Sequence, residues 1–145
     1  MKIVASISLI ILAVVFTNCN EAKKVIEATA SEQLIGKYSV TELNDTKVSK
    51  GKAISFEISE LNKSIKGTTS CNSFSGNFTK DGYSLRITEM NISESYCDDV
   101  LMKWEQSLLR AFNVTGSYII KQHVLIFYSY SDHSVILKAK KDTIQ

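Results

Sequence analysis

Short stretches of alternating apolar and polar residues dominate the chain from about position 34 onward. A period of two predicts strands with one buried face, and it is clearest over residues 38–43, 53–58 and 83–87. Asp81-Gly82 precedes the last of these and is typical of a tight hairpin, because both residue types accept positive φ. Further strands are expected over 64–69, from Phe78 onward, and over 117–121, 124–130 and 134–139.

One segment after Cys97 has helical spacing instead. Its apolar residues recur every three or four positions, which predicts an amphipathic helix: Leu101, Trp104, Leu108 and Phe112. Ser95 or Asp98 can cap the beginning of this helix, and residues 113–116 should end it.

The order of these elements predicts a fold class. Four or five strands, one helix and three more strands favour a single α+β domain, with a curved or barrel-like antiparallel β-sheet and one packed α-helix. Residues 124–128 are apolar on both faces, which predicts a central strand. We see no internal repeat and no second domain.

The first 33 residues have a different pattern. Met1-Lys2 is followed by about 14 apolar residues, and the chain turns polar after Cys19. Such a run is too short to span a bilayer and matches the apolar region of a signal peptide. We therefore expect a lipoprotein-type signal peptide over 1–18, a tether over 19–33 and the domain over 34–141.

Cys19, at the end of the apolar run, resembles the lipidation site of bacterial lipoproteins. The resemblance implies cleavage before Cys19, acylation of the new N-terminus, and a domain held outside the cytoplasm in the bacterial cell envelope by its lipid. Asn18 and Phe16 depart from the small residue and the Leu that are usual at these positions. An ordinary secretory signal cut nearby, or an uncleaved anchor, is the alternative.

The number of cysteines indicates whether a disulfide is expected in an exported chain. Without Cys19, the remaining cysteines are Cys71 and Cys97, and one remaining pair in an exported chain favours a disulfide. Two buried free thiols are the alternative. With no CxxC motif and only His123 and His133 besides, we expect no metal site.

Charge and motifs argue against two functional classes. The formal net charge of +2 comes without a conspicuous basic cluster, so we expect no nucleic-acid partner. No phosphate-binding loop, nucleophile elbow or paired-carboxylate motif stands out. The sequence therefore predicts no catalytic residue, no cofactor and no enzyme.

The chain also resembles the META domain family, also called HslJ-like, of bacterial heat-inducible lipoproteins. The matching residues are 34–38, 65–67, 71–78 (Cys-Asn-Ser-Phe-Ser-Gly-Asn-Phe), Cys97, Met102, Glu105, 108–109, 118–120 and Leu125. Ser70, Ser73 and Ser93 stand where the family usually has Gly, Arg and Thr. The resemblance implies a non-enzymatic envelope lipoprotein associated with stress or envelope maintenance. The alternative is a binding module or inhibitor for an unknown peptide or partner protein.

The structural motif of that resemblance comprises Asn72, Phe74, Gly76 and Glu105. We interpret residues 71–76 as a rigid turn, shaped by Asn72 and Gly76 and stapled to the helix start through Cys97. A ligand-binding loop is the alternative. Since a carboxylate beside an apolar stripe needs partners, we expect Glu105 to accept hydrogen bonds from backbone groups of residues 71–75.

Overall fold

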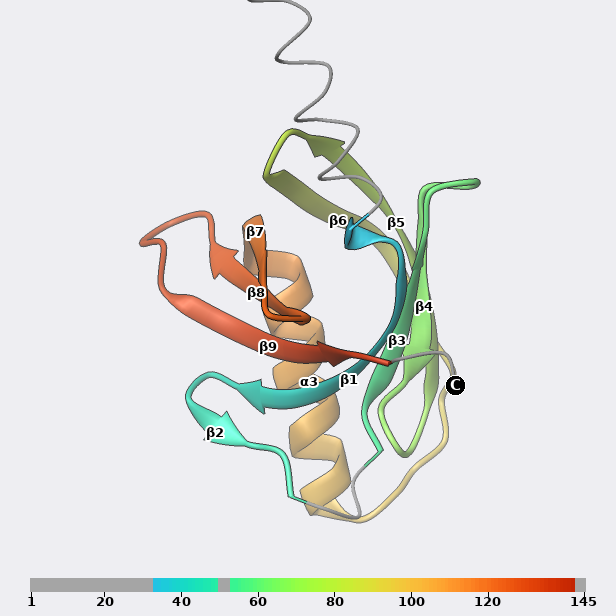
Figure 1. Ribbon diagram of the computed structural model, residues 1–145. Helices are drawn as coiled ribbons and strands as arrows, with labels where there is room; N and C mark the ends of the chain where they lie inside the picture. Colours follow the sequence, from blue (N-terminus) through green and yellow to red (C-terminus); the bar gives the residue numbers. More distant parts are fainter. Residues whose placement is uncertain (1–32, 50–52, 143–145) are drawn as a thin grey trace, which may run out of the picture.

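The computed structural model describes residues 33–49 and 53–142 (Figure 1). Its elements are β1 (Gly36–Leu43), β2 (Thr46–Lys47), β3 (Ser55–Ser59), β4 (Ser64–Thr68), β5 (Ser73–Asp81), β6 (Ser84–Ile92), α3 (Asp99–Val114), β7 (Thr115–Lys121), β8 (Val124–Ser129) and β9 (Val135–Lys141). The predicted signal peptide and the predicted lipidation of Cys19 lie outside the described residues, as does all but the last residue of the predicted tether.

The strands form an antiparallel sheet that closes on itself. Neighbouring strands pair in the order β1, β3, β4, β5, β6, β7, β8 and β9, and β9 pairs again with β1. β2 pairs only with β1, outside this ring of eight. The predicted barrel-like sheet with one packed helix is thus present in a single domain, although the fold is mostly β.

The barrel has one weak seam, between β6 and β7. Their ladder contains a single pair, Ser84 with Ser117, whereas β5 and β6 are paired along most of their length. The helix α3 contacts β6, and makes fewer contacts with β1 and β9. The helix thus packs beside β6, the strand whose pairing with β7 consists of a single residue pair.

Aromatic side chains join the helix to the barrel interior. Phe112 of α3 meets Phe56 edge-on, with ring centroids 5.6 Å apart, and also lies near Phe74 and Phe127. Phe56 stacks on Tyr38 at 5.4 Å. All five are buried, and such ring pairs stabilise a core beyond the area that they bury.

The helix boundaries follow from local chemistry. Asp98 is the N-cap, and its carboxylate accepts hydrogen bonds from the backbone of Val100 and Leu101 at 2.9 and 3.0 Å. This confirms Asp98 as the cap, one of the two predicted candidates. The helix ends where β7 begins, and the Thr115 hydroxyl donates to the Ala111 carbonyl at 2.8 Å.

The prediction that Gly76 shapes a turn was wrong. Residues 73–76 belong to β5, so Gly76 lies within a strand. It lies opposite a bulge in β6, where Glu89 has a φ of 54°. A Cβ on Gly76 would lie 2.4 Å from the Met90 sulfur and 3.0 Å from the Thr88 backbone oxygen, so the close approach of β6 favours glycine here.

The strand β8 differs from its prediction in burial. It does have a neighbour on each side, β7 and β9. However, Val124, Ile126 and Tyr128 are only partly buried, while Leu125 and Phe127 are buried. In a closed barrel every strand has two neighbours and one outward face, so an apolar run need not be buried on both sides.

Candidate functional site

The motif around Cys71 forms the turn between β4 and β5 and its connection to α3. Cys71 and Cys97 are joined as a disulfide, with sulfurs 1.98 Å apart and Cα atoms 6.0 Å apart. Within the turn, Thr69 donates its backbone N–H to the Asn72 carbonyl at 2.9 Å, and Ser70 takes a positive φ of 73°. The turn therefore spans residues 69–72, earlier than predicted.

Asn72 links the turn to the segment before the helix. Its side chain is buried, with 2% of the residue exposed. The carboxamide oxygen accepts from the Ser93 hydroxyl (2.9 Å) and the Ser95 backbone N–H (2.8 Å), and the amide donates to the Ser95 carbonyl (3.0 Å). The same amide donates to Glu105, so Asn72 holds three segments together.

Glu105 is the buried carboxylate at the centre of this arrangement. It is 6% exposed, and one carboxylate oxygen accepts from the Thr69 hydroxyl at 2.7 Å and the Asn72 amide at 3.0 Å. Glu105 thus reaches the predicted turn. Its donors there are side chains, where we expected backbone groups, because Asn72 and Thr69 direct their polar groups inward.

Thr69 is the residue that sequence reasoning missed. Its buried hydroxyl donates to Glu105 and accepts the Asn72 backbone N–H at 3.0 Å. A threonine just after a strand gives little signal by itself. Only its nearness to a helix residue 36 positions away reveals the role.

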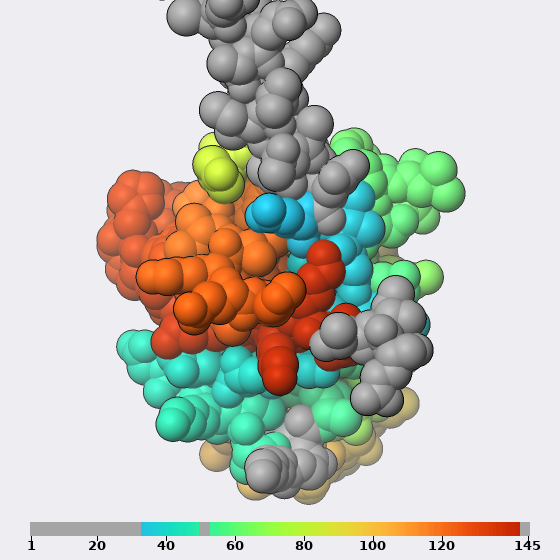
Figure 2. Space-filling model, viewed as in Figure 1, coloured from blue at the N-terminus to red at the C-terminus, as the bar shows by residue number. Residues whose placement is uncertain are grey.

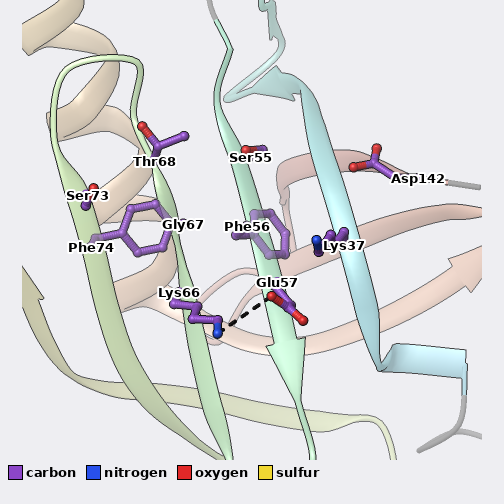
Figure 3. Close-up of a pocket in the computed structure, with 10 residues that line it drawn as sticks. All are labelled: Lys37, Ser55, Phe56, Glu57, Lys66, Gly67, Thr68, Ser73, Phe74 and Asp142. Carbon is purple, nitrogen blue, oxygen red and sulfur yellow. Dashed lines mark ion pairs between the residues drawn. The ribbon is translucent and has the colours of Figure 1, made fainter. Parts of the chain in front are cut away.

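A separate hollow of about 510 Å³ lies on the barrel surface over β1, β3, β4 and β5. Figure 3 shows the residues that line it: Lys37, Ser55, Phe56, Glu57, Lys66, Gly67, Thr68, Ser73, Phe74 and Asp142. Lys66 and Glu57 form an ion pair with nitrogen and oxygen 3.8 Å apart. Three small hydroxyl side chains, those of Ser55, Thr68 and Ser73, leave the hollow open.

Ser73 connects this hollow to the motif. It is exposed and begins β5, directly after Asn72. An arginine at this position, as is usual in the family that the sequence resembles, would project from the same strand and occupy part of the space. The hollow and the Asn72 network therefore meet where the β4–β5 turn leads into β5.

The titratable groups with shifted pKa values include two core tyrosines, and hydrogen bonds from Ser134 lower the pKa of the exposed Asp132 carboxyl. Burial, with a smaller contribution from Tyr83, raises the pKa of Tyr118 to about 12. Burial also raises the pKa of Tyr38, whose hydroxyl donates to the Leu34 carbonyl at 2.8 Å. Both phenols are neutral near pH 7, so neither is suited to proton transfer there. Burial lowers the pKa of Lys141.

Within residues 33–49 and 53–142, no group of three or more His, Cys, Asp or Glu side chains is placed to hold a metal ion. His123 and His133 lie in different turns, each with positive φ. In that same part of the chain, no helix has both the length and the apolarity needed to cross a membrane.

The family model called META domain matches residues 32–142 of the chain. This chain belongs to the META domain family. The matched range contains every element of the barrel and the whole Asn72–Glu105 network. None of the curated proteins compared with the chain matched it.

Solved structures share the fold of this META domain at low sequence identity. A protein from Burkholderia xenovorans, solved by NMR, has 15% identity and a TM-score of 0.62, covering 81% of this chain and 89% of its own. A DUF4847 family protein from Bacteroides vulgatus has 9% identity and a TM-score of 0.58, covering 81% and 99%. Identities this low support a common fold alone.

Proposed function

We propose that this META domain protein is a non-enzymatic lipoprotein of the bacterial cell envelope, held at a membrane by lipid on Cys19. The observation that carries the proposal is the disulfide between Cys71 and Cys97. Disulfides persist in oxidising compartments and are rare in the cytosol. An exported domain agrees with the apolar run that ends just before Cys19.

The arrangement of Glu105 supports a structural role for the motif. Its carboxylate accepts hydrogen bonds from Thr69 and Asn72, and the Asn72 side chain is fully engaged by Ser93, Ser95 and Glu105. A general acid or base must reach a substrate proton within hydrogen-bond distance. Because Glu105 and Asn72 are buried and already hydrogen-bonded to each other, they are better suited to holding the fold rigid than to catalysis. A rigid domain suits a protein that maintains the envelope under stress.

A second function, binding of a peptide or partner protein, is favoured by the hollow over β1, β3, β4 and β5. Its volume of about 510 Å³ is within the range of small-ligand sites. Lys37 forms no ion pair within the described residues and lines one side. The side chain of an acidic or polar ligand could therefore meet an available cation there.

Lipid attachment is tested by expressing the full chain in a bacterial host and measuring the mass of its mature N-terminal peptide. We expect a peptide that begins at Cys19 and carries acyl chains, and protein in the membrane fraction. Cys19→Ser should lose the acyl mass, whereas the neighbouring control Asn20→Ala should keep it. A mature N-terminus elsewhere, or an unmodified Cys19 in the wild type, would contradict the proposal.

A further inference from the structure

The antiparallel barrel has two rims that differ in sequence. Gly36, at the start of β1, pairs with Ile58 near the end of β3, and Lys141, at the end of β9, pairs with Tyr38. The start of β1, the end of β9 and the turns β3–β4, β5–β6 and β7–β8 therefore share one rim, because antiparallel strands reverse at each turn. We call residues 36–37, 60–63, 80–84, 121–124 and 140–142 the N-terminal rim.

The opposite rim contains the disulfide. It consists of the β1–β2, β4–β5 and β8–β9 turns and the connection from β6 to α3. We call residues 44–47, 69–72, 93–99 and 130–134 the disulfide rim. Figure 1 shows the β3–β4 and β5–β6 turns projecting at the end where the blue start of the described chain lies, while the β4–β5 turn lies at the far end.

The two rims carry opposite charge. The N-terminal rim has six lysines and three carboxylates: Lys37, Lys63, Lys80, Lys121, Lys140 and Lys141, with Glu60, Asp81 and Asp142. Among the described residues, the disulfide rim has one lysine and five carboxylates: Lys47, with Asp45, Glu94, Asp98, Asp99 and Asp132. The near-neutral composition of the whole chain conceals this polarity.

Much of the positive charge is available to a partner. Four of the six lysines, Lys37, Lys80, Lys121 and Lys140, form no ion pair within residues 33–49 and 53–142. Lys63 pairs with Glu60 of the same turn. The Lys141 ammonium donates to the Gln33 carbonyl at 2.8 Å.

Two large apolar side chains stand out from the same rim. Leu61, at the tip of the β3–β4 turn, is 97% exposed, and Tyr83, at the β5–β6 turn, is 54% exposed. The two turns appear on either side of the blue start of the chain in Figure 2, as green and yellow-green atoms. Exposed apolar groups among cations are typical of surfaces that enter the headgroup region of a bilayer.

We propose that the N-terminal rim rests on the anionic lipid surface of the membrane that anchors the chain. The proposal depends on the lipid attachment to Cys19 proposed above. Gln33 follows Cys19 by 14 positions, so even a fully extended connection reaches only about 50 Å. The chain enters the domain at this rim, since Gln33 contacts Lys141 and Tyr38 through its carbonyl.

Electrostatics orients the domain in the same sense. Anionic headgroups attract the lysines of the N-terminal rim and repel the carboxylates of the disulfide rim, within a screening length of about 8 Å at physiological salt. The Cys71–Cys97 turn would then face away from the membrane, together with Thr68 and Ser73 at the adjoining end of the hollow.

Hydrogen exchange on the full lipidated protein in vesicles tests this orientation. We expect backbone amides at residues 61–63 and 82–84 to exchange at least threefold more slowly in phosphatidylglycerol vesicles than in phosphatidylcholine vesicles. High salt should abolish the difference, and residues 69–72, in the β4–β5 turn of the disulfide rim, should show none. Equal exchange in both vesicle types, with the protein still floating with the lipid, would overturn the orientation and leave the anchoring intact.

Charge reversal supplies a matched pair of variants. Lys121→Glu with Lys140→Glu removes two exposed cations from the N-terminal rim, and should abolish the protection. Lys47→Glu with Lys103→Glu makes the same charge change beside the β1–β2 turn. This variant should keep the protection from exchange. Equal loss in both variants would overturn the proposal.

Two further measurements complete the test. The first asks whether the N-terminal rim binds a membrane surface or any soluble polyanion. The second asks whether a negative result comes from a wrong orientation or from a missing lipid anchor. If soluble polyphosphate without vesicles gives the same protection, the rim binds polyanions in general and the membrane assignment is wrong. If the wild-type protein does not float with either vesicle type, the lipid attachment itself fails, and the orientation fails with it.

Discussion

Asn72 in the β4–β5 turn donates its side-chain amide to Glu105 on α3 at 3.0 Å, across 33 positions of sequence. The same Asn72 side chain holds Ser93 and Ser95 before the helix. The turn, the connection and the helix are therefore fastened by one buried amide and one buried carboxylate, and the disulfide closes the same segments covalently.

Removing the Glu105 carboxylate should destabilise the domain strongly. Glu105→Ala leaves the Thr69 hydroxyl and the Asn72 amide without their shared acceptor, which should lower the free energy of unfolding by about 3 kcal/mol. Urea unfolding measures the change. Gln106→Ala, on the exposed side of the same helix, is the control and should change it by less than about 0.5 kcal/mol.

Breaking the disulfide should also lower stability, by a different mechanism. The bond joins residues 26 positions apart, and losing it should cost roughly 3 kcal/mol through the entropy of the unfolded chain. The double variant Cys71→Ser and Cys97→Ser should unfold at lower denaturant concentration than the oxidised wild type. Titration of two free thiols in oxidised, unfolded mature protein would show that the bond does not form.

Two glycines should respond differently to the same substitution. At Gly67, a Cβ would lie 2.1 Å from the Ser55 carbonyl oxygen and 2.8 Å from the Phe56 Cα, so Gly67→Ala should cost about 3 kcal/mol through overpacking against backbone. At Gly82 nothing lies within 4 Å, but φ is +56°, so Gly82→Ala should cost only about 1 kcal/mol. Thermal unfolding distinguishes them, and similar melting temperatures would contradict the register of β4.

The raised pKa of Tyr118 predicts an alkaline limit of stability. Since burial raises this pKa from 10.0 to about 12, the folded state keeps the proton more tightly than the unfolded state does. The contribution of Tyr118 is fully present below pH 10 and is lost as the pH rises from about 10 to 12.

Stability measured across this pH range should therefore fall less steeply in Tyr118→Phe than in the wild type. Tyr96→Phe is the control, because Tyr96 is 83% exposed, and its slope should match the wild type. Phenolate absorbance follows the titration directly. A Tyr118 that ionises near pH 10 in the folded protein would rule out a raised pKa as the cause.

The local features of the fold were predictable because they depend on neighbouring residues. Alternation located most strands, the stripe that includes Leu108 and Phe112 located the helix, and Asp98 was one of the two candidate caps. The same patterns misplaced Gly76, because a glycine in a motif gives no sign whether it serves a turn or a close approach between strands. They also could not identify Thr69 as a partner of Glu105.

By itself, the sequence determined the strand-rich pattern, the single packed helix, the family and the cysteine pair that remains beside Cys19. Only the tertiary structure decided how β9 meets β1 to close the barrel, which side chains satisfy Glu105, and that lysines and carboxylates gather on opposite rims. The reason is physical. Periodicity and capping act over a few residues, whereas strand pairing brings together groups up to about a hundred positions apart, as between Ser39 and Asp142.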